Sequence, residues 1–259
     1  KDDSHMTGLR RLPFRVRPLP DEPLDSWLEA MAAAHGATFG QMITALGLAG
    51  PDAVPDDQGY SVGRMNRWLF YLEEGQLERL TLATGLPAAA LQATTRSSFA
   101  ATVTKYTLKG RLSIQCPTAG TQGRFCPECL LDSGGRWRLS WTYAFVAVCP
   151  RHRRVLSDIC PTCGKQPRVR PQPMYLVPTP GHCHNRPPKT YDPRQRCGND
   201  LSQETARLEA SAAMLTAQRA QFATISQGVG RFGMYQENPQ PANVVMEDIR
   251  TIARIAVRA

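Results

Sequence analysis

The sequence predicts a mainly α-helical protein with small metal-stabilised modules. Seven of its eight cysteines fall within residues 126–197, in two consecutive groups spaced like metal ligands. On both sides of this region, apolar residues recur at helical spacing. The chain has 42% hydrophobic residues but 7% aromatic residues and 21 prolines, so several small units are expected rather than one large core.

The N-terminal unit is predicted to be a helical domain over residues 7–115, after a cloning remnant at residues 1–6. Between Pro23, which suits a first helical turn, and Gly36, one helix is predicted from Leu24, Trp27, Leu28 and Met31. Thr38 is expected to cap a second helix, which ends at Gly47 and has an apolar face of Phe39, Met42, Ile43 and Leu46.

A helix-turn-helix-like outline follows in the same domain. Residues 49–63 are expected to form a loop, and Trp68, Leu69 and Leu72 to belong to a third helix. Leu77 and Leu80 mark a helix that ends at Gly85, and Pro87 starts another that runs through Leu91. Residues 87–95 contain no charge, whereas base readout needs side chains that reach base edges, so sequence readout by this helix is not favoured.

The first cysteine group predicts a zinc site formed by Cys126, Cys129, Cys149 and His152. A C-x-x-C turn points two thiolates at one centre, and two further ligands complete a tetrahedral site. Disulfides, a redox C-x-x-C pair and unpaired buried cysteines are the alternatives. No secretory segment indicates an oxidising compartment, and no βαβ pattern surrounds either C-x-x-C pair, so zinc is favoured.

The second group predicts another zinc site, formed by Cys160, Cys163, Cys183 and Cys197. His182 and His184 flank Cys183 and are alternatives for its third ligand. Four protein ligands leave no position for water or substrate, so both Zn²⁺ ions are expected to be structural. Together the groups define a tandem zinc-finger or zinc-ribbon domain over residues 116–200, in which Cys116 has no assigned role.

Three further elements are predicted around and beyond the cysteines. A stripe of Trp137, Trp141, Phe145 and Val148 favours an amphipathic helix packed on the first site. Residues 165–196, with eight prolines, are expected to form a long insertion within the second site. Residues 201–259 form a C-terminal helical segment, in which apolar spacing predicts one helix from Leu208, Ala212, Leu215 and Phe222 and another from Val245, Ile249, Ile252, Ile255 and Ala256. The chain stops inside that last helix, so it is expected to be truncated.

Acidic and basic residues are concentrated in different parts of the chain. Residues 21–92 hold three basic and ten acidic side chains, whereas residues 96–170 hold thirteen Lys or Arg and three acids. A basic segment attracts phosphate and an acidic one is repelled by it. The expected DNA contacts are Lys105, Lys109, Arg111, Arg136, Arg138, Arg151, Arg153 and Arg154. The alternative is that these cations only solvate a small zinc module.

The order of these elements resembles the TniQ/TnsD family of transposon accessory proteins. The resemblance rests on residues 12–28, on Phe125-Cys126-Pro127-Glu128-Cys129, and on the run from Trp137 through Cys149-Pro150-Arg151-His152 to Cys160-Pro161-Thr162-Cys163-Gly164. It implies a non-catalytic target selector that binds DNA or a target-bound complex and recruits an AAA+ ATPase, which brings the transposase. Some family members bind an attachment site directly, and others are guided by a CRISPR effector complex. A bacterial, cytoplasmic and nucleoid-associated location follows.

The acidic helical segment is the expected surface for a protein partner, with Glu73, Glu74 and Glu78 as the candidate contacts. An enzyme is not expected, because the acids are spread out rather than clustered around metal ions, and no phosphate-binding G-x-x-x-x-G-K-[ST] motif occurs. The alternative function is a zinc-containing helix-turn-helix transcription regulator, which would need a basic recognition helix.

Overall fold

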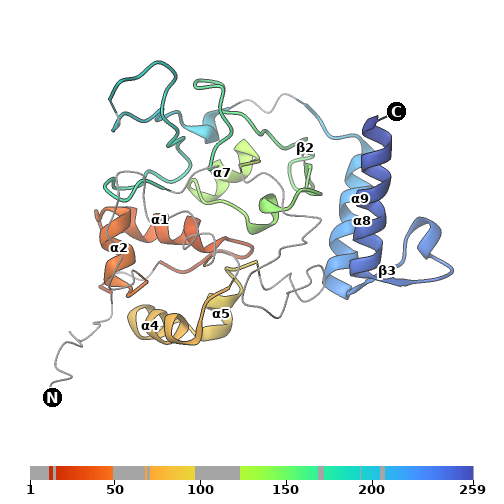
Figure 1. Cartoon of the computed structure of the whole chain (residues 1–259), viewed down its shortest axis with the longest axis horizontal. Helices are drawn as coiled ribbons and strands as arrows, with labels where there is room; N and C mark the ends of the chain where they lie inside the picture. The colour runs from red at the N-terminus through yellow and green to blue at the C-terminus, as the bar shows by residue number, and fades with distance from the viewer. Residues whose placement is uncertain are drawn as a thin grey trace.

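The computed structural model describes residues 12–13, 16–48, 68, 71–96, 123–168, 172–192, 194–204 and 208–258. Over these residues the chain is mainly helical, with two short two-stranded sheets. Figure 1 shows three parts, which we call the helical module (described residues up to 96), the cysteine segment (123–204) and the helix pair (208–258). The predicted boundary at residues 115 and 116 lies outside the described residues.

The helical module begins with α1 (Leu24–Ala34) and α2 (Phe39–Ala45), as predicted. Pro23 occupies the N-cap of α1. Thr38 caps α2 in a capping box, in which its hydroxyl accepts from the Gln41 backbone N–H while the Gln41 side chain accepts from the Thr38 N–H. These local signals fix where the second helix begins.

The two helices predicted on either side of Gly85 are both present. Helix α4 (Glu74–Thr84) ends at Gly85, which adopts the left-handed conformation (φ +71°), and α5 (Ala88–Gln92) follows Pro87. The predicted loop 49–63 and Leu69 lie outside the described residues. Leu72, which was predicted to lie in the third helix, is buried but not helical. The core of the module is formed by large buried side chains, which include Leu24, Trp27, Leu28, Met31, Phe39, Ile43, Leu46, Leu80 and Leu91.

The amphipathic helix predicted over residues 137–148 is wrong. The cysteine segment contains α7 (Pro127–Ser133), but Leu139–Thr142 form only a short 3₁₀ turn, η1, and the chain then extends into β1 (Val148–Cys149). Asp21 explains the break, because its backbone carbonyl accepts from the Leu139 N–H (2.5 Å) and its carboxylate accepts from the Ser140 N–H (3.0 Å). These bonds to the helical module replace the contacts of a continuing helix, while both tryptophans of the stripe stay buried.

The proline-rich insertion is not a free loop. Its Met174 side chain is 3% exposed and joins the core of the helical module. The first two backbone N–H groups of α2 donate to it, from Phe39 to the Leu176 carbonyl (2.9 Å) and from Gly40 to the Met174 carbonyl (2.8 Å). The insertion therefore satisfies donors that a helix start leaves unpaired, and it ties the cysteine segment to α2.

The helix pair consists of α8 (Ala212–Gln227) and α9 (Ala242–Arg258), which lie side by side in Figure 1. They are joined through β3 (Val229–Gly230), the 3₁₀ turn η3 (Gly233–Tyr235) and β4 (Gln240–Pro241). Leu208 lies outside α8 because the Ser211 hydroxyl caps the helix, accepting from the Met214 N–H.

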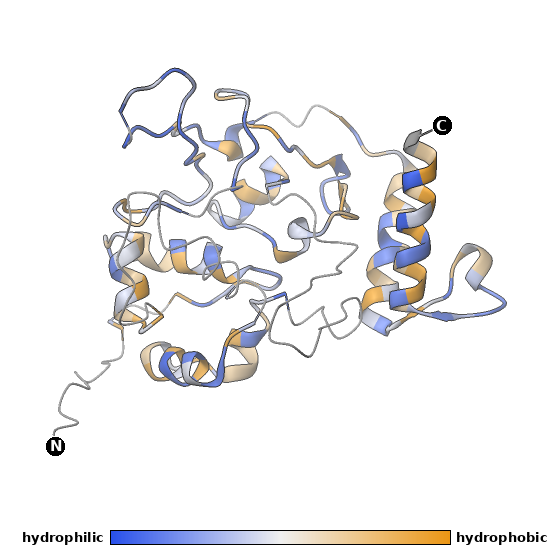
Figure 2. Ribbon diagram, in the orientation of Figure 1, coloured by the Kyte–Doolittle hydropathy of each residue, from blue (hydrophilic) through white to orange (hydrophobic). Residues whose placement is uncertain are grey.

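Contacts from α8 hold the cysteine segment in place. The Gln218 side-chain oxygen accepts from the Ala147 backbone N–H at 2.9 Å, and Leu215 packs on Val148. Figure 2 shows both polar and apolar residues on the helices, as expected of helices that cover a core with one face. Within the described residues, no helix combines the length and apolar character needed to cross a membrane.

Candidate metal centres

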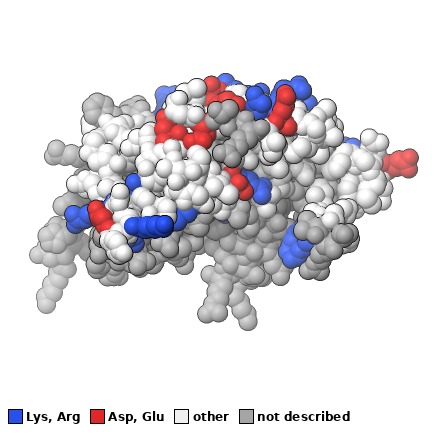
Figure 3. All heavy atoms as spheres, turned by 90° about the horizontal axis from the view of Figure 1, so that it is seen from above, with Lys and Arg blue, Asp and Glu red and all other residues white. Residues whose placement is uncertain are grey.

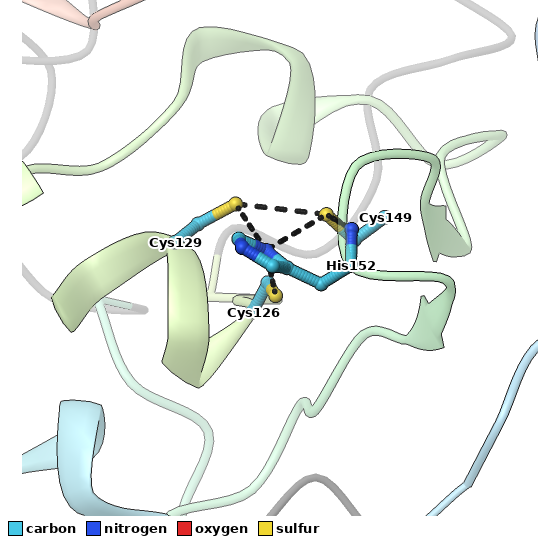
Figure 4. A group of neighbouring side chains, drawn as sticks. All are labelled: Cys126, Cys129, Cys149 and His152. Atoms are coloured by element: carbon cyan, nitrogen blue, oxygen red, sulfur yellow. Dashed lines mark hydrogen bonds between the residues drawn. The ribbon is translucent and has the colours of Figure 1, made fainter. Parts of the chain in front are cut away.

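The first predicted ligand set comes together in space. Cys126 is the N-cap of α7 and Cys129 lies one turn further on, so both side chains face one point. β1 pairs antiparallel with β2 (Arg154–Val155), so that Cys149 at the end of β1 and His152 in the turn that follows reach the same point. Figure 4 shows the four side chains converging, with His152 between the three sulfurs.

The distances fit a tetrahedral zinc ion. Zn–S bonds of about 2.3 Å at tetrahedral angles separate two sulfurs by about 3.8 Å, and a sulfur from a ligating nitrogen by slightly less. The Cys129 and Cys149 sulfurs lie 3.5 Å apart, and His152 Nδ1 lies 3.4, 3.2 and 3.6 Å from the sulfurs of Cys126, Cys129 and Cys149. The donor set and its spacing therefore suit one metal ion.

A carboxylate orients the histidine ligand. His152 Nε2 lies 3.2 Å from Asp132 Oδ2, on the side of the ring away from the sulfurs. A metal ion bound to Nδ1 would leave the ring proton on Nε2, where it would be donated to Asp132, an arrangement that strengthens a histidine ligand. Hydrogen bonds from Cys126 and Cys129, with the His152 backbone N–H, hold the pKa of the Cys149 thiol well below its usual range. Asp132 was not among the residues predicted from the sequence, although it follows Cys129 by three residues.

The second set assembles in the same way. The sulfur atoms of Cys160 and Cys197 lie 3.7 Å apart and those of Cys163 and Cys183 lie 3.8 Å apart, again near the spacing of two thiolates on one zinc ion. The four sulfurs lie within 4.8 Å of one another, and neither flanking histidine belongs to this group, so Cys183 is the third member. A disulfide would need sulfurs about 2.05 Å apart, so none joins these pairs.

The two centres belong to one packed unit. Gly135, just after α7, touches Gly181, two residues before Cys183: a Cβ on Gly135 would lie 2.3 Å from the Pro180 carbonyl oxygen. The Gly181 carbonyl accepts from the N–H of Leu201, the first residue of the 3₁₀ turn η2 (Leu201–Gln203), which packs on α7. The second cluster is therefore built against the helix that carries the first.

Most cations that were expected to contact DNA near the first centre have acidic partners. Arg136 pairs with Glu22 and donates to the Arg17 carbonyl, with 14% of its side chain exposed. Its donors are used internally, so the geometry does not favour it as a phosphate ligand. Arg151 lies 2.8 Å from Asp132, while Arg154 lies 3.5 Å from Glu128.

Two of the expected contacts, Arg138 and Arg153, form no ion pair within the described part of the chain. Arg153 is exposed, in the turn between β1 and β2, and Arg138 is partly exposed. Lys105, Lys109 and Arg111 lie outside the described residues. The surface around the first centre therefore offers less positive charge for binding phosphate than its number of arginines predicts.

Buried charge joins the helical module to the cysteine segment. Arg168 binds the carboxylates of Asp25 and Glu29 on α1 and is 9% exposed. Burial raises the pKa of Glu29 to about 7, against the effect of Arg168, and Asp25 raises it further. Burial also raises the pKa of Asp21 to about 6, against its hydrogen bonds with Ser140. No sequence signal marked these residues, because their partners lie more than a hundred positions away.

The acidic candidates for partner binding share one end of α4. Glu73 is the N-cap, Glu74 opens the helix, Glu78 follows one turn later, and all three are exposed. In Figure 1, α4 lies at the bottom of the molecule, whereas the loop before Cys197 lies at the top. The acidic helix end and that loop are on opposite sides.

Comparison with known proteins identifies the family. A search of curated proteins finds no match. A family model described as TniQ matches residues 13–156. The match covers more than half of the chain, from the segment before α1 to β2, and includes all four residues of the first centre. The chain therefore belongs to the TniQ family, which is linked to target selection in transposition.

Proposed function

We propose that this protein is a non-catalytic accessory factor that selects the target site for transposition. It binds DNA or a target-bound complex and recruits an AAA+ transposition regulator. The family match carries the proposal. The two ligand sets support a non-catalytic role, because four protein ligands around each ion leave no open coordination position for water or substrate.

Zinc is the metal that the donor chemistry favours. Cys₃His and Cys₄ are the sets that hold structural zinc, and thiolates disfavour calcium and magnesium. Each ion would fix the loops that surround it: the β1–β2 turn at the first centre, and the proline-rich insertion at the second. In this proposal, the ions hold surfaces in place and take part in no reaction.

Opposite charges are assigned to different partners. The exposed carboxylates of Glu73, Glu74 and Glu78 suit a basic surface on the ATPase, whereas Arg138 and Arg153 suit phosphate. Arg151 can join them only in competition with Asp132. A CRISPR effector complex bound at the target is a further partner that would bring the protein to DNA without sequence readout of its own.

Readout of bases by α5 is not part of the proposal. This helix, Ala88–Gln92, is short and uncharged, whereas a recognition helix presents several side chains to base edges. The same observation argues against the alternative of a helix-turn-helix transcription regulator.

The test is binding to the AAA+ ATPase encoded by the same transposon. The E74Q/E78Q variant, which leaves the capping residue Glu73 intact, is compared with E237Q/E247Q, which removes two exposed acids from the helix pair. We expect E74Q/E78Q to weaken ATPase binding by about three- to tenfold, since exposed charge pairs contribute up to about 1 kcal/mol each. DNA affinity and the control variant should be unaffected. If the wild-type protein and both variants bind the ATPase with equal affinity, α4 is not part of the interface. If none of the three binds the ATPase, recruitment is refuted.

A further inference from the structure

The loop between Cys183 and Cys197 has a fixed base. The Cys183 N–H donates to the Asn199 carbonyl (2.8 Å), the Gly198 N–H to the Cys183 carbonyl (2.9 Å), and the Cys197 N–H to the Asn185 carbonyl (2.8 Å). Both ends of the loop are thus paired to each other and carry ligands of the second centre. We call its described residues, 186–192 and 194–196, the basic loop.

Positive charge dominates this loop. Arg186, Lys189 and Arg194 are exposed, and the loop's one acid among the described residues, Asp192, accepts a hydrogen bond from the Arg194 backbone N–H. Lys165 adds a further exposed cation beside it, with its ammonium 2.8 Å from the Arg186 carbonyl. Figure 3, which views the molecule from the side of this loop, shows Lys and Arg side chains gathered at the lower left.

These cations differ from most of those at the first centre, where only Arg138 and Arg153 form no ion pair within the described residues. Within the part of the chain that the structure describes, no ion pair joins Lys165, Arg186, Lys189 or Arg194 to a carboxylate. Arg151 and Arg154, in contrast, lie beside Asp132 and Glu128. A cation that already faces a carboxylate must give up that partner to bind phosphate, whereas an unpaired one need not. The electrostatic attraction for phosphate is therefore stronger at the basic loop.

The aromatic side chains favour a duplex over a single strand. Tyr191 is fully exposed on the loop, whereas the ring of Tyr175 is covered by the guanidinium of Arg196 at 5.5 Å. Surfaces for single strands stack successive bases on several aromatic rings. A single exposed ring, that of Tyr191, among several cations suits duplex DNA instead: the cations would contact the phosphate backbone and the ring would lie against the edge of a groove.

We propose that the basic loop binds the phosphate backbone of duplex DNA without sequence preference, and that it is the main DNA contact of the described chain. The inference rests on the proposed function and specifies which surface meets the target. The second metal centre would then fix the position of the loop, since Cys183 and Cys197 at its two ends both belong to that centre.

The test compares two variants that each lose three exposed positive charges. R186Q/K189Q/R194Q changes the basic loop, and R219Q/R231Q/R254Q changes the helix pair. Zinc content and circular dichroism verify folding, and affinity for a random duplex is measured across a salt titration. Each lost phosphate contact lowers the slope of log affinity against log salt by about 0.9, so the loop variant should lose about 2 to 3 from its slope. The control should keep its slope, and Y191A should lose affinity with an unchanged slope.

Other outcomes separate this inference from the proposed function. In one such outcome, the loop variant keeps the wild-type slope of log affinity against log salt, while R138Q/R153Q has a smaller slope. DNA is then contacted at the first centre, so the loop inference is wrong although the proposed function stands. Loss of affinity by the loop variant for single-stranded RNA but not for the duplex would also overturn it. If the wild-type protein recruits the ATPase but binds no duplex, the protein is an adaptor, and again only the loop inference fails.

Discussion

The guanidinium of Arg168 lies 5.0 Å from the ring centroid of Trp137, and the same guanidinium binds two carboxylates of α1. Arg168 comes from the insertion in the second centre, and Trp137 from the segment between α7 and η1. One buried side chain therefore joins both ligand-bearing regions to the helical module. Arg168 is thus a buried contact between the insertion of the second centre and α1.

Replacing Arg168 should be costly. R168M keeps much of the side-chain volume but leaves Asp25 and Glu29 without their cation, and breaking a buried pair costs about 3 to 5 kcal/mol. Urea unfolding of zinc-loaded protein measures the loss. K165M, a nearby exposed position, should change stability by less than about 0.5 kcal/mol. A loss in R168M no larger than that of K165M would show that the contact does not join the modules.

Stability should fall as pH rises through the range of the buried acids. Folding raises the pKa of Glu29 to about 7 and that of Asp21 to about 6, so the folded state keeps protons that the unfolded state releases. Their stabilisation is complete below the unfolded pKa of about 4 and is lost as pH rises through 6 to 7. From about pH 5.5 to about pH 8, the free energy of unfolding should decrease by about 2 to 3 kcal/mol.

Chemical unfolding at saturating zinc measures this pH dependence, and E29Q should flatten it by more than half. Keeping the window above about pH 5.5 limits protonation of the metal ligands. Stability that is constant or rises across the window in both proteins would contradict the assigned burial of Glu29.

The orienting carboxylate of the first centre should matter for metal affinity. D132N keeps the shape of the side chain but weakens the acceptor for His152 Nε2, and such changes lower metal affinity by about 10- to 100-fold. Competition with a chromogenic chelator measures the loss, which should be confined to one of two bound ions. D158N, an exposed acid in the same segment, is the control. Equal affinities in D132N and D158N would exclude the Asp132–His152 hydrogen bond as a support of the site.

Two adjacent glycines test the packing of the centres. Gly134 and Gly135 both have positive φ, but a Cβ at Gly134 meets nothing within 4 Å, whereas one at Gly135 would collide with Pro180. G134A should cost about 1 kcal/mol from backbone strain alone. G135A should cost at least about 2 kcal/mol more, because overpacking is added. Thermal unfolding compares them, and equal losses would mean that the centres fold separately.

Local signals predicted much of the helical module and both ligand sets. The helix cap at Thr38, the helix end at Gly85 and the C-x-x-C spacing each depend on residues a few positions apart, so they can be recognised from the sequence alone. The helix predicted from the aromatic stripe was wrong because the stripe has helical spacing, whereas Asp21, more than a hundred residues earlier, accepts hydrogen bonds from Leu139 and Ser140 that select a turn. Likewise, the DNA contact predicted at Arg136 rested on the number of basic residues in the segment, which does not reveal that Arg136 forms an ion pair with the distant Glu22.

In the proposed function, this protein places an AAA+ regulator on target DNA. The most direct measurement is assembly of the fluorescently labelled ATPase on single duplex molecules, with and without zinc-loaded protein bound at a marked position. We expect assembly to begin at the marked protein and to depend on Glu74 and Glu78 of α4. Assembly at the same rate and at random positions with or without the protein would contradict the claim.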